Sequence, residues 1–523
     1  MPTTGQVGRA RAALGYVFHC FMFVAAAAAA SWPTFVNGQP FLLSDTLTYI
    51  READAAVYKL TGSATEWTQR YVDRFETSRA GSEENAVARP AKQRPVIISG
   101  RSIYYGAFLY TMDRLAGLRF AAFAQALLAV ACIYGTVRRF ARREQARVFL
   151  LLVGGLSAIS SLAYFSSYLV PDLFAALAIL AAAHLCTARP SLSGRALTFW
   201  TAIACLSALF HSANIAILAV ILMVAVGTRL LRGSPAFSRL SLIALSILVG
   251  AAGERVFDLS VEHQFGSPPV RPPFLAARLI ADGPGVAYLR ETCPGSGFDL
   301  CRYIDRFPTA RNYPYSDTFL WSANPRIGAF SAVEPDERRR MAAEGTRFAV
   351  AVLKAHPLAV IESGARDVAA QAIRWRLSDF NDDASDRDYK GKNLPARVLR
   401  EQRETPAFRG AMPVEPFQTL TLITALASLV LIARAFRADT DKGALTFVAV
   451  LLVGIVANVI ICGSLSTPHD RYLMRVAWLL PLGVFVIAAV RSTQASRSQL
   501  PTDRESPQHG SVERECFSSD LPQ

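Results

Sequence analysis

About ten apolar stretches run through this chain of 523 residues, each close to the 20 or so residues with which a helix crosses a bilayer. Only 18% of the residues are charged, whereas about a quarter is typical of a soluble protein. We therefore predict an all-α polytopic membrane protein with about ten transmembrane helices. The predicted spans are residues 14–35, 118–137, 147–166, 171–188, 196–210, 212–228, 239–256, 417–434, 443–462 and 474–490.

The basic residues predict how the chain is threaded through the membrane. The net charge is +14, but Lys and Arg gather in short runs beside the apolar stretches, which argues against nucleic acid as a partner. Under these spans the runs all fall on one side, which the positive-inside rule makes cytoplasmic. They are Arg9, Arg11, Arg138, Arg139, Arg142, Arg143, Arg147, Arg189, Arg195, Arg229, Arg232, Arg239, Arg434, Arg437 and Lys442. Both termini are then cytoplasmic, and we expect the inner membrane of a bacterium.

Two long segments would lie on the opposite side, in the periplasm of a Gram-negative cell. The chain accordingly divides into four predicted parts. They are an N-terminal transmembrane module of about seven helices (1–256, including the periplasmic loop 36–117), a large periplasmic segment (257–416), C-terminal spans (417–491) and a disordered cytoplasmic tail (492–523).

The first periplasmic loop carries two helical patterns, near 45–60 and 64–78. A polar stretch from Ser78 to Arg94 follows, and then an apolar, aromatic stretch at 96–115. We interpret this last stretch as an interfacial or re-entrant segment.

The large periplasmic segment predicts two amphipathic helices, at 335–355 and 356–375, that meet at Pro357 and rest near the membrane surface. An acidic run follows them and lacks the glycine of a calcium loop, so a solvated loop is predicted. The run consists of Asp379, Asp382, Asp383, Asp386 and Asp388.

Cys293 and Cys301 flank a short Pro-Gly-Ser-Gly turn in the large periplasmic segment. Disulfides form in the periplasm, and no further zinc ligands lie near these two cysteines. We therefore predict a disulfide, worth about 2 to 3 kcal/mol for so short a loop.

Four polar clusters, far apart in the sequence, fall at the outer membrane boundary once the spans are drawn. Ionisable groups at such a depth are costly unless they find partners or serve a cavity. Their convergence on one face is the strongest functional indication in the sequence. The clusters are Ser44-Asp45-Thr46 with Tyr49, Pro171-Asp172, His211-Ser212 with Asn214, and His469-Asp470-Arg471-Tyr472.

Each cluster also has a purely structural interpretation. Asp45 and Asp172 stand at predicted helix starts, where a carboxylate caps backbone N–H groups. His211 could simply form the turn of a tight helical hairpin. Arg471 could pair with Asp470 or anchor the chain at the lipid headgroups.

The pattern of spans and clusters resembles the GT-C superfamily of integral-membrane glycosyltransferases. The residues that carry the resemblance are Ser44-Asp45-Thr46-Leu47-Thr48-Tyr49, Pro171-Asp172-Leu173-Phe174, and Pro468-His469-Asp470-Arg471-Tyr472-Leu473 followed by Pro481. The architectural likeness covers most of the chain, although the first loop lacks the adjacent acidic pair of several GT-C families.

The resemblance implies a polyprenyl-phosphate or polyprenyl-diphosphate sugar as donor, an envelope glycan, lipid or protein as acceptor, and inversion at the anomeric carbon. Asp45 would take the proton from the acceptor hydroxyl, with Asp172 as the other candidate base. Arg471, and after it Arg101, would bind the departing phosphate.

The resemblance also suggests residues for substrate binding. Arg101 and Tyr104 lie in a Ser-Gly-Arg-Ser-Ile-Tyr-Tyr-Gly stretch, where glycine permits close approach and tyrosine stacks on sugars. The same Arg and Tyr could instead anchor the chain at the membrane interface. Tyr49, Asp172, His211 and His469 complete the predicted substrate site.

Two questions stay open at this point. Asp45 and Asp172 could share a divalent cation, but two distant carboxylates do not define a metal site, so no metal ligand is assigned and the cofactor is unknown. A transporter or lipid flippase, which would favour broken helices near the bilayer midplane, and a non-enzymatic envelope scaffold are the alternative functions.

Overall fold

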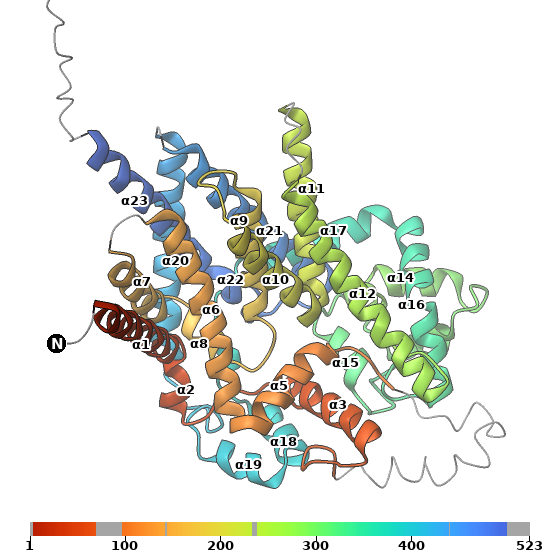
Figure 1. Ribbon diagram of the computed structural model, residues 1–523. Coiled ribbons are helices and arrows are strands. Elements are labelled where there is room, and N and C mark those ends of the chain that lie inside the picture. Colours follow the sequence, from red (N-terminus) through yellow and green to blue (C-terminus); the bar gives the residue numbers. More distant parts are fainter. Residues whose placement is uncertain (1–3, 70–96, 142–143, 233–237, 439, 499–523) are drawn as a thin grey trace, which may run out of the picture.

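A computed structural model describes residues 4–69, 97–141, 144–232, 238–438 and 440–498, with side chains from Gly15 to Ser492. These residues form helices joined by short connections, and no strand longer than an isolated bridge occurs among them (Figure 1). The predicted polar stretch from Ser78 to Arg94 and most of the predicted tail lie outside the described residues.

Six helical stretches within these ranges are long and apolar enough to cross a membrane. This confirms the predicted class, a polytopic helical membrane protein. The stretches are α6 (Leu118–Phe140), α11 (Ser212–Leu231), α12 (Leu240–Phe265), α20 (Val414–Arg437), α21 (Lys442–Leu465) and Asp470–Ser492, which joins α22 (Asp470–Ala477) to α23 (Leu479–Ser498).

The other four predicted spans correspond to shorter apolar stretches of helix. At 1.5 Å per residue the 14 residues of α9 extend about 21 Å, less than the roughly 30 Å of a hydrocarbon core. The count of ten spans therefore stays a prediction. These helices are α1 (Thr4–Ala30, apolar from Gly15), α7 (Gln145–Ile159), α9 (Leu173–Cys186) and α10 (Gly194–Phe210).

The predicted helix 147–166 is interrupted, so this prediction is wrong in detail. Ser160 is extended and ends α7, and its hydroxyl donates to the Leu156 carbonyl oxygen. The hydroxyl of Ser161 donates to the Met474 carbonyl oxygen, which fixes the turn before the short helix α8 (Leu162–Ser166). Serines that bond to nearby backbone groups favour such breaks over a continuous helix.

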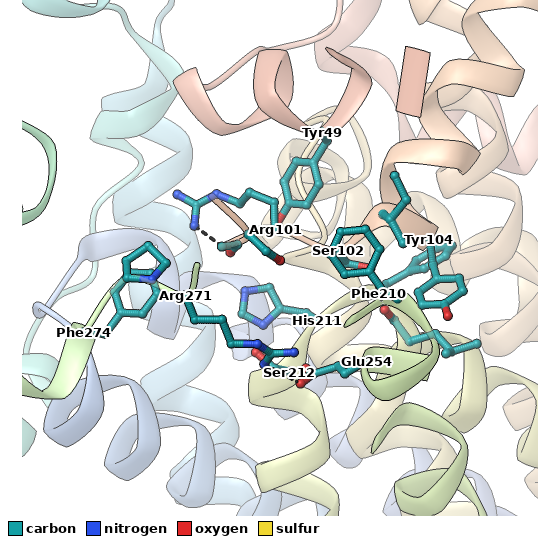
Figure 2. A pocket seen from close by; sticks show the side chains of 16 residues that line it. Tyr49, Arg101, Ser102, Tyr104, Phe210, His211, Ser212, Glu254, Arg271 and Phe274 are labelled. Carbon is teal, nitrogen blue, oxygen red and sulfur yellow. Dashed lines mark hydrogen bonds and ion pairs between the residues drawn. The ribbon is translucent and has the colours of Figure 1, made fainter. Parts of the chain in front are cut away.

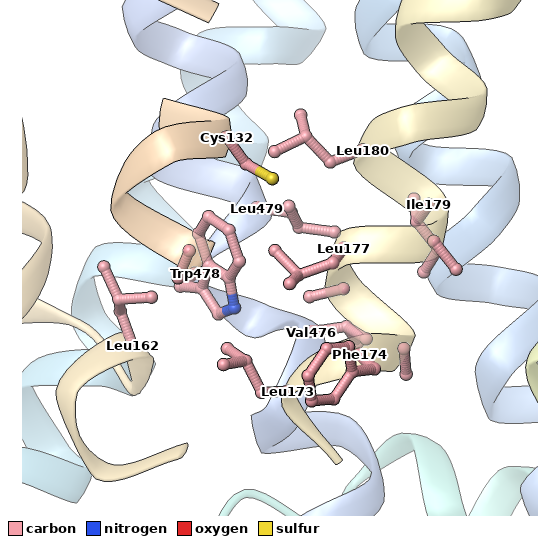
Figure 3. Packing of buried hydrophobic residues seen from close by; sticks show 14 of the residues in the cluster. Cys132, Leu162, Leu173, Phe174, Leu177, Ile179, Leu180, Val476, Trp478 and Leu479 are labelled. Carbon is pink, nitrogen blue, oxygen red and sulfur yellow. The ribbon is translucent and has the colours of Figure 1, made fainter. Parts of the chain in front are cut away.

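Helix α9 forms the centre of the molecule, because every one of its residues is buried. A helix that is apolar on all sides is stable inside a protein, where neighbouring elements cover it on every side. Trp478 packs beside it, among Leu162, Leu177 and Leu479 (Figure 3). Helix α21 approaches α9 closely at Gly454, where a Cβ would lie 2.5 Å from a methyl carbon of Ile179.

The loop predicted to be periplasmic at 36–117 folds onto the membrane module through three helices, α2 (Trp32–Asn37), α3 (Ser44–Thr61) and α5 (Ile103–Ala116). The apolar stretch predicted at 96–115 contains α5, which packs between α3 and α6. Gly106 allows this contact, because a Cβ there would lie only 2.3 Å from the Tyr49 carbonyl oxygen.

The large segment predicted to be periplasmic, 257–416, has a second hydrophobic core of its own, which includes Phe319, Phe330 and Phe348. The predicted disulfide between Cys293 and Cys301 is present beside this core, with an S–S distance of 1.99 Å. The helices of this part are α13 (Phe274–Asp282), α14 (Pro284–Thr292), the 3₁₀ helix η3 (Asp299–Arg306), α15 (Tyr315–Trp321), α16 (Pro335–Ala355) and α17 (Pro357–Ala372).

Helices α16 and α17 confirm the predicted pair and its break at Pro357, where the axes bend by 108°. Both helices also pack against the rest of the protein. Helix α16 buries Met341 and Phe348 in the second core, and α17 packs against α21.

The acidic run is not a solvated loop, and that prediction is wrong. Asp382 is buried and its carboxylate lies 2.6 Å from the ammonium of Lys390, while Asp383 caps the helix that follows. The elements here are η4 (Ser378–Phe380), α18 (Ala384–Asn393) and α19 (Ala396–Arg403).

The helical bundle has two chemically different ends. Three predicted cytoplasmic connections meet at one end, where Arg139, Arg229 and Arg239 donate to backbone carbonyl oxygens between residues 186 and 190. The four polar clusters meet at the other end, beside α3, α5 and α22. We call the second end the outer end, following the predicted topology.

Candidate active site

Asp45 and Arg101 form an ion pair at the outer end of the bundle. A guanidinium nitrogen of Arg101 lies 2.5 Å from Oδ1 of Asp45, and both side chains are 21% exposed. Arg101 also lies over the ring of Trp321 in α15, 5.8 Å from its centre. The two predicted functional residues are thus direct partners, which nothing in the sequence specified.

Local structure fixes both members of this pair. Asp45 stands in the first turn of α3, where a negative charge is favourable, but Leu43 occupies the cap position and Thr46 bonds to its N–H. The predicted capping role of Asp45 is therefore wrong. Arg101 precedes α5, whose cap Ser102 donates to the Leu209 carbonyl oxygen at 2.7 Å and so ties this segment to the end of α10.

Arg471 in α22 lies among three carboxylates and is hydrogen-bonded to none of them. Its guanidinium nitrogens are 4.0 Å from Asp45, 3.9 Å from Asp172 and 3.9 Å from Asp379. Charge-assisted hydrogen bonds are about 2.7 to 2.9 Å long, so these contacts are electrostatic only. The buried Nε of Arg471 has no hydrogen-bond partner among the described residues. The suggested pairing with Asp470 is wrong, because Asp470 faces Arg374 at 3.7 Å.

Asp172 anchors the inner part of the cluster. It stands at the start of α9, as predicted, but its carboxylate makes no cap and lies 2.6 Å from Arg475. Arg475 is 1% exposed and also donates to Oδ1 of Asn458 at 2.7 Å. Buried charges need such pairing, so these residues hold α9, α21 and α22 together.

A pocket of about 260 Å³ adjoins the Asp45–Arg101 pair. Arg101 lines this pocket (Figure 2). Its walls come from the segment before α5, from the α10–α11 turn, from α12 and from the chain before α13. Ligand pockets are commonly about 300 to 1,000 Å³, so this space suits one small ring better than an extended chain. The polar side chains that line it are Tyr49, Ser99, Arg101, Ser102, Tyr104, His211, Ser212, Glu254 and Arg271.

His211 lies in this pocket between Arg101 and Arg271 (Figure 2). Its Nδ1 accepts a hydrogen bond from the Ala213 N–H, so the ring caps α11 and confirms the proposed hairpin role. Burial, and then the charge of Arg475, lowers the pKa of His211 to about 4. The neutral ring therefore carries its proton on Nε2, which makes that nitrogen a hydrogen-bond donor.

The remaining predicted residues have unequal positions. Tyr49 and Tyr104 line the pocket, but the Tyr104 hydroxyl is engaged by the Gly253 carbonyl oxygen at 2.8 Å. His469 lies outside the pocket wall and is fixed by two backbone hydrogen bonds to Gln371. Burial, followed by the charges of Arg471 and Arg374, lowers the pKa of His469 to about 4.

The charges of the site set the acidity of its carboxyl groups. Burial alone would raise the pKa of the Asp45 carboxyl, but Arg101 and Arg471 outweigh burial and hold this pKa below its usual range. Burial raises the pKa of Asp379 in spite of the opposing charge of Arg471. Asp45 is thus ionised at neutral pH and available to accept a proton.

Glu52 extends the same face of α3, seven residues after Asp45. Burial raises its pKa from 4.5 to about 8, with Arg101 opposing this shift and Asp45 adding to it. One buried carboxylate oxygen of Glu52 makes no hydrogen bond within the described part of the chain.

Two members of the cluster were missed by the sequence analysis. Arg475 had a recognisable signal, since it follows Arg471 by four residues on one helix and interrupts an apolar run. Asp379 had none, because only the path of the segment 257–416 brings it to Arg471.

The donor set fits arginine better than a metal ion. No group of three or more His, Cys, Asp or Glu side chains within the described ranges could hold a metal. Asp45, Asp172 and Asp379 instead surround the guanidinium of Arg471.

Comparison of the chain with protein-family models, with curated proteins and with solved structures gave no match.

Proposed function

We propose that this protein is a membrane glycosyltransferase that moves a sugar from a polyprenyl-phosphate carrier to an acceptor of the cell envelope. The observation that carries this proposal is the Asp45–Arg101 pair, with Arg471 4.0 Å away, beside a pocket of about 260 Å³. A carboxylate next to two guanidinium groups supplies both a base and a phosphate site.

The reaction balances with these groups alone. The acceptor oxygen bonds to the anomeric carbon from the face opposite the leaving phosphate, while Asp45 takes the hydroxyl proton. The bond between the anomeric carbon and the phosphate oxygen breaks, and its electron pair leaves with the lipid phosphate. Arg101 and Arg471 offset the negative charge that develops there, and the configuration inverts.

Binding of the donor would also activate the base. Without donor, the positive charges of Arg101 and Arg471 hold the pKa of Asp45 low, which makes it a weak base. A phosphate competes for the same guanidinium groups and draws part of their charge away from Asp45. The pKa of Asp45 then rises toward its usual range, so proton acceptance strengthens only when donor is present.

Exposure favours Asp45 over Asp172 as the base. The Asp172 side chain is only 5% exposed and is committed to Arg475, whereas Asp45 is 21% exposed and contacts a residue of the pocket wall. Asp172 is better suited to positioning Arg471 and Arg475.

The direct test is sugar transfer by the purified protein in lipid nanodiscs, with a panel of polyprenyl-phosphate sugars and an envelope extract as acceptor. Mass spectrometry of the products should show a sugar-sized gain with wild type and a loss of about 10²- to 10⁴-fold with Asp45→Asn. Asp388→Asn is the matched control, because that exposed carboxylate pairs only with the surface residue Lys392 in the described structure.

Equal turnover by the Asp45→Asn variant would remove Asp45 as the base. Absence of product with every donor, from protein that remains folded, would turn attention to the alternatives. Movement of labelled lipid without a covalent product would favour a transporter or flippase, and an unchanged cellular phenotype in an Asp45, Asp172 and His211 triple variant would favour a scaffold.

A further inference from the structure

A groove of about 860 Å³ lies at the opposite end of the bundle from the candidate active site. Helices α11 and α21 form its two sides, and the end of α9 and Phe436 of α20 complete it. Its volume falls within the roughly 300 to 1,000 Å³ of ordinary ligand sites.

Four cationic side chains line the mouth of this groove, namely Arg189, Arg229, Arg232 and Lys442. No Asp or Glu belongs to its lining within the described ranges. Arg229 is half-buried and donates to the Cys186 carbonyl oxygen, while the other three are exposed. The described lining of the groove therefore carries positive charge and no carboxylate, and its occupant should be an anion.

Apart from Thr228 and Thr446, the rest of the lining is apolar and runs deep between the helices. From Lys442 to Val453 along α21, and from Arg232 back to Ile221 along α11, the distance is 11 residues, or about 16 Å. Because a hydrocarbon core is roughly 30 Å thick, the apolar part matches the depth of one leaflet. A soluble anion would leave this part exposed, whereas an acyl chain would fill it.

We propose that the groove binds an anionic phospholipid of the bilayer, with its phosphate at the basic rim and an acyl chain between α11 and α21. Lys and Arg beside an anionic headgroup are each worth about fivefold in affinity. The site is independent of the proposed transfer reaction, because none of its residues lines the outer pocket.

The experiment measures lipid retained by the full-length protein in native mass spectrometry, with phosphatidylglycerol and phosphatidylcholine as probes. The groove variant carries Arg189→Gln, Arg232→Gln and Lys442→Gln, and leaves Arg229 in place because it bonds to the α9 backbone. The matched control removes three exposed charges from the same end but outside the groove, through Arg138→Gln, Arg195→Gln and Arg437→Gln.

Wild type and the control should retain phosphatidylglycerol equally and prefer it to phosphatidylcholine. The groove variant should bind phosphatidylglycerol roughly ten- to a hundredfold more weakly. Equal losses in the two triple variants, or no preference for the anionic lipid, would overturn the proposal.

A second variant tests the apolar part without changing charge. Ala225→Trp places an indole in the groove, whereas Ala427→Trp places one on the exposed face of α20. Only the first should lower lipid retention. Glycerol 1-phosphate should fail to displace the bound lipid, since it lacks an acyl chain, and displacement at comparable concentration would assign the rim to a soluble phosphate instead.

Discussion

Arginine is concentrated at both ends of the helical bundle, but the two ends differ in the carboxylates that surround it. At the outer end, Arg101, Arg471 and Arg475 face Asp45, Asp172 and Asp379 in a nearly closed cluster. At the other end, the groove between α11 and α21 has four cations and no acid in its described lining. Balanced buried charge holds groups in position, whereas unbalanced charge over an apolar cleft attracts a charged amphiphile.

The difference shows how position, rather than residue type, decides what an arginine does in a membrane protein. Arg475 is 1% exposed and stabilises the fold through its ion pair with Asp172. The Nε of Arg471, in contrast, has no hydrogen-bond partner among the described residues, and its carboxylate contacts are 3.9 Å or longer. Removing charge should therefore unfold the inner part of the outer cluster and impair chemistry at its rim. Removing the three exposed cations of the groove should affect only the binding of lipid.

The largest expected effect is on stability, from Asp172→Asn. This change leaves the buried Arg475 without its carboxylate, and breaking a buried pair costs about 3 to 5 kcal/mol. Thermal unfolding, followed by reaction of the buried thiols of Cys132 and Cys462 with a fluorescent dye, should begin at a clearly lower temperature.

Asp388→Asn is the control for this prediction, since the Asp388–Lys392 pair is exposed and worth at most about 1 kcal/mol. The double variant Asp172→Asn with Arg475→Met should recover much of the loss, because it removes the unpaired charge as well. Equal melting of Asp172→Asn and wild type would mean that the two ends of the bundle do not differ in the way described.

The sequence predicted which residues belong to the outer cluster better than it predicted which of them contact one another. Apolar length and the positive-inside rule brought Asp45, Asp172 and Arg471 to one end, because both depend on local composition. The pairing of Asp45 with Arg101 depends on the contact between α3 and α5, which no local pattern encodes. The acidic residues around Asp379 favour a solvated loop in the sequence, and they give no sign of the folded segment that brings Asp379 to Arg471.

The groove was missed for a related reason. Its cations were interpreted only as topology signals, which is correct for each residue taken alone. A site requires in addition that α11 and α21 lie side by side and leave space between them, and this is a property of packing.

The next largest effect concerns catalysis, through Arg471→Lys. An ammonium keeps the charge but loses the planar fork that would bind two phosphate oxygens of the proposed donor, so we expect transfer to fall about 10- to 100-fold with little change in melting temperature. Single-turnover transfer at saturating donor is the measurement. Arg397→Lys is a suitable control, because Arg397 lies at the surface with Glu66. An unchanged rate in the Arg471 variant would assign the phosphate to Arg101 alone.

Asp379→Asn should have a smaller effect and separates positioning from base catalysis. Asp379 contacts Arg471 at 3.9 Å and does not line the pocket, so its loss should shift the orientation of Arg471 and reduce transfer about three- to tenfold. The pH–rate profile should keep its shape, since Asp45 remains the base. If Asp379→Asn instead abolishes transfer and Asp45→Asn does not, the roles of these two carboxylates are reversed.

The smallest effect sharpens the comparison through pH. Burial raises the pKa of Glu52 from 4.5 to about 8, so the folded protein retains a proton that the unfolded chain releases between these values. The free energy of unfolding should therefore fall as pH rises from about 4.5 to 8 and level off above. Glu52→Gln should flatten this fall, by roughly 1 to 2 kcal/mol between pH 6 and 9, in thermal unfolding at each pH.

Retention of phosphatidylglycerol by the groove should be the same in this variant and wild type at every pH, because Glu52 lies at the other end of the bundle. A pH-dependent change in lipid retention caused by Glu52→Gln would show that the two ends are coupled through the helices that connect them.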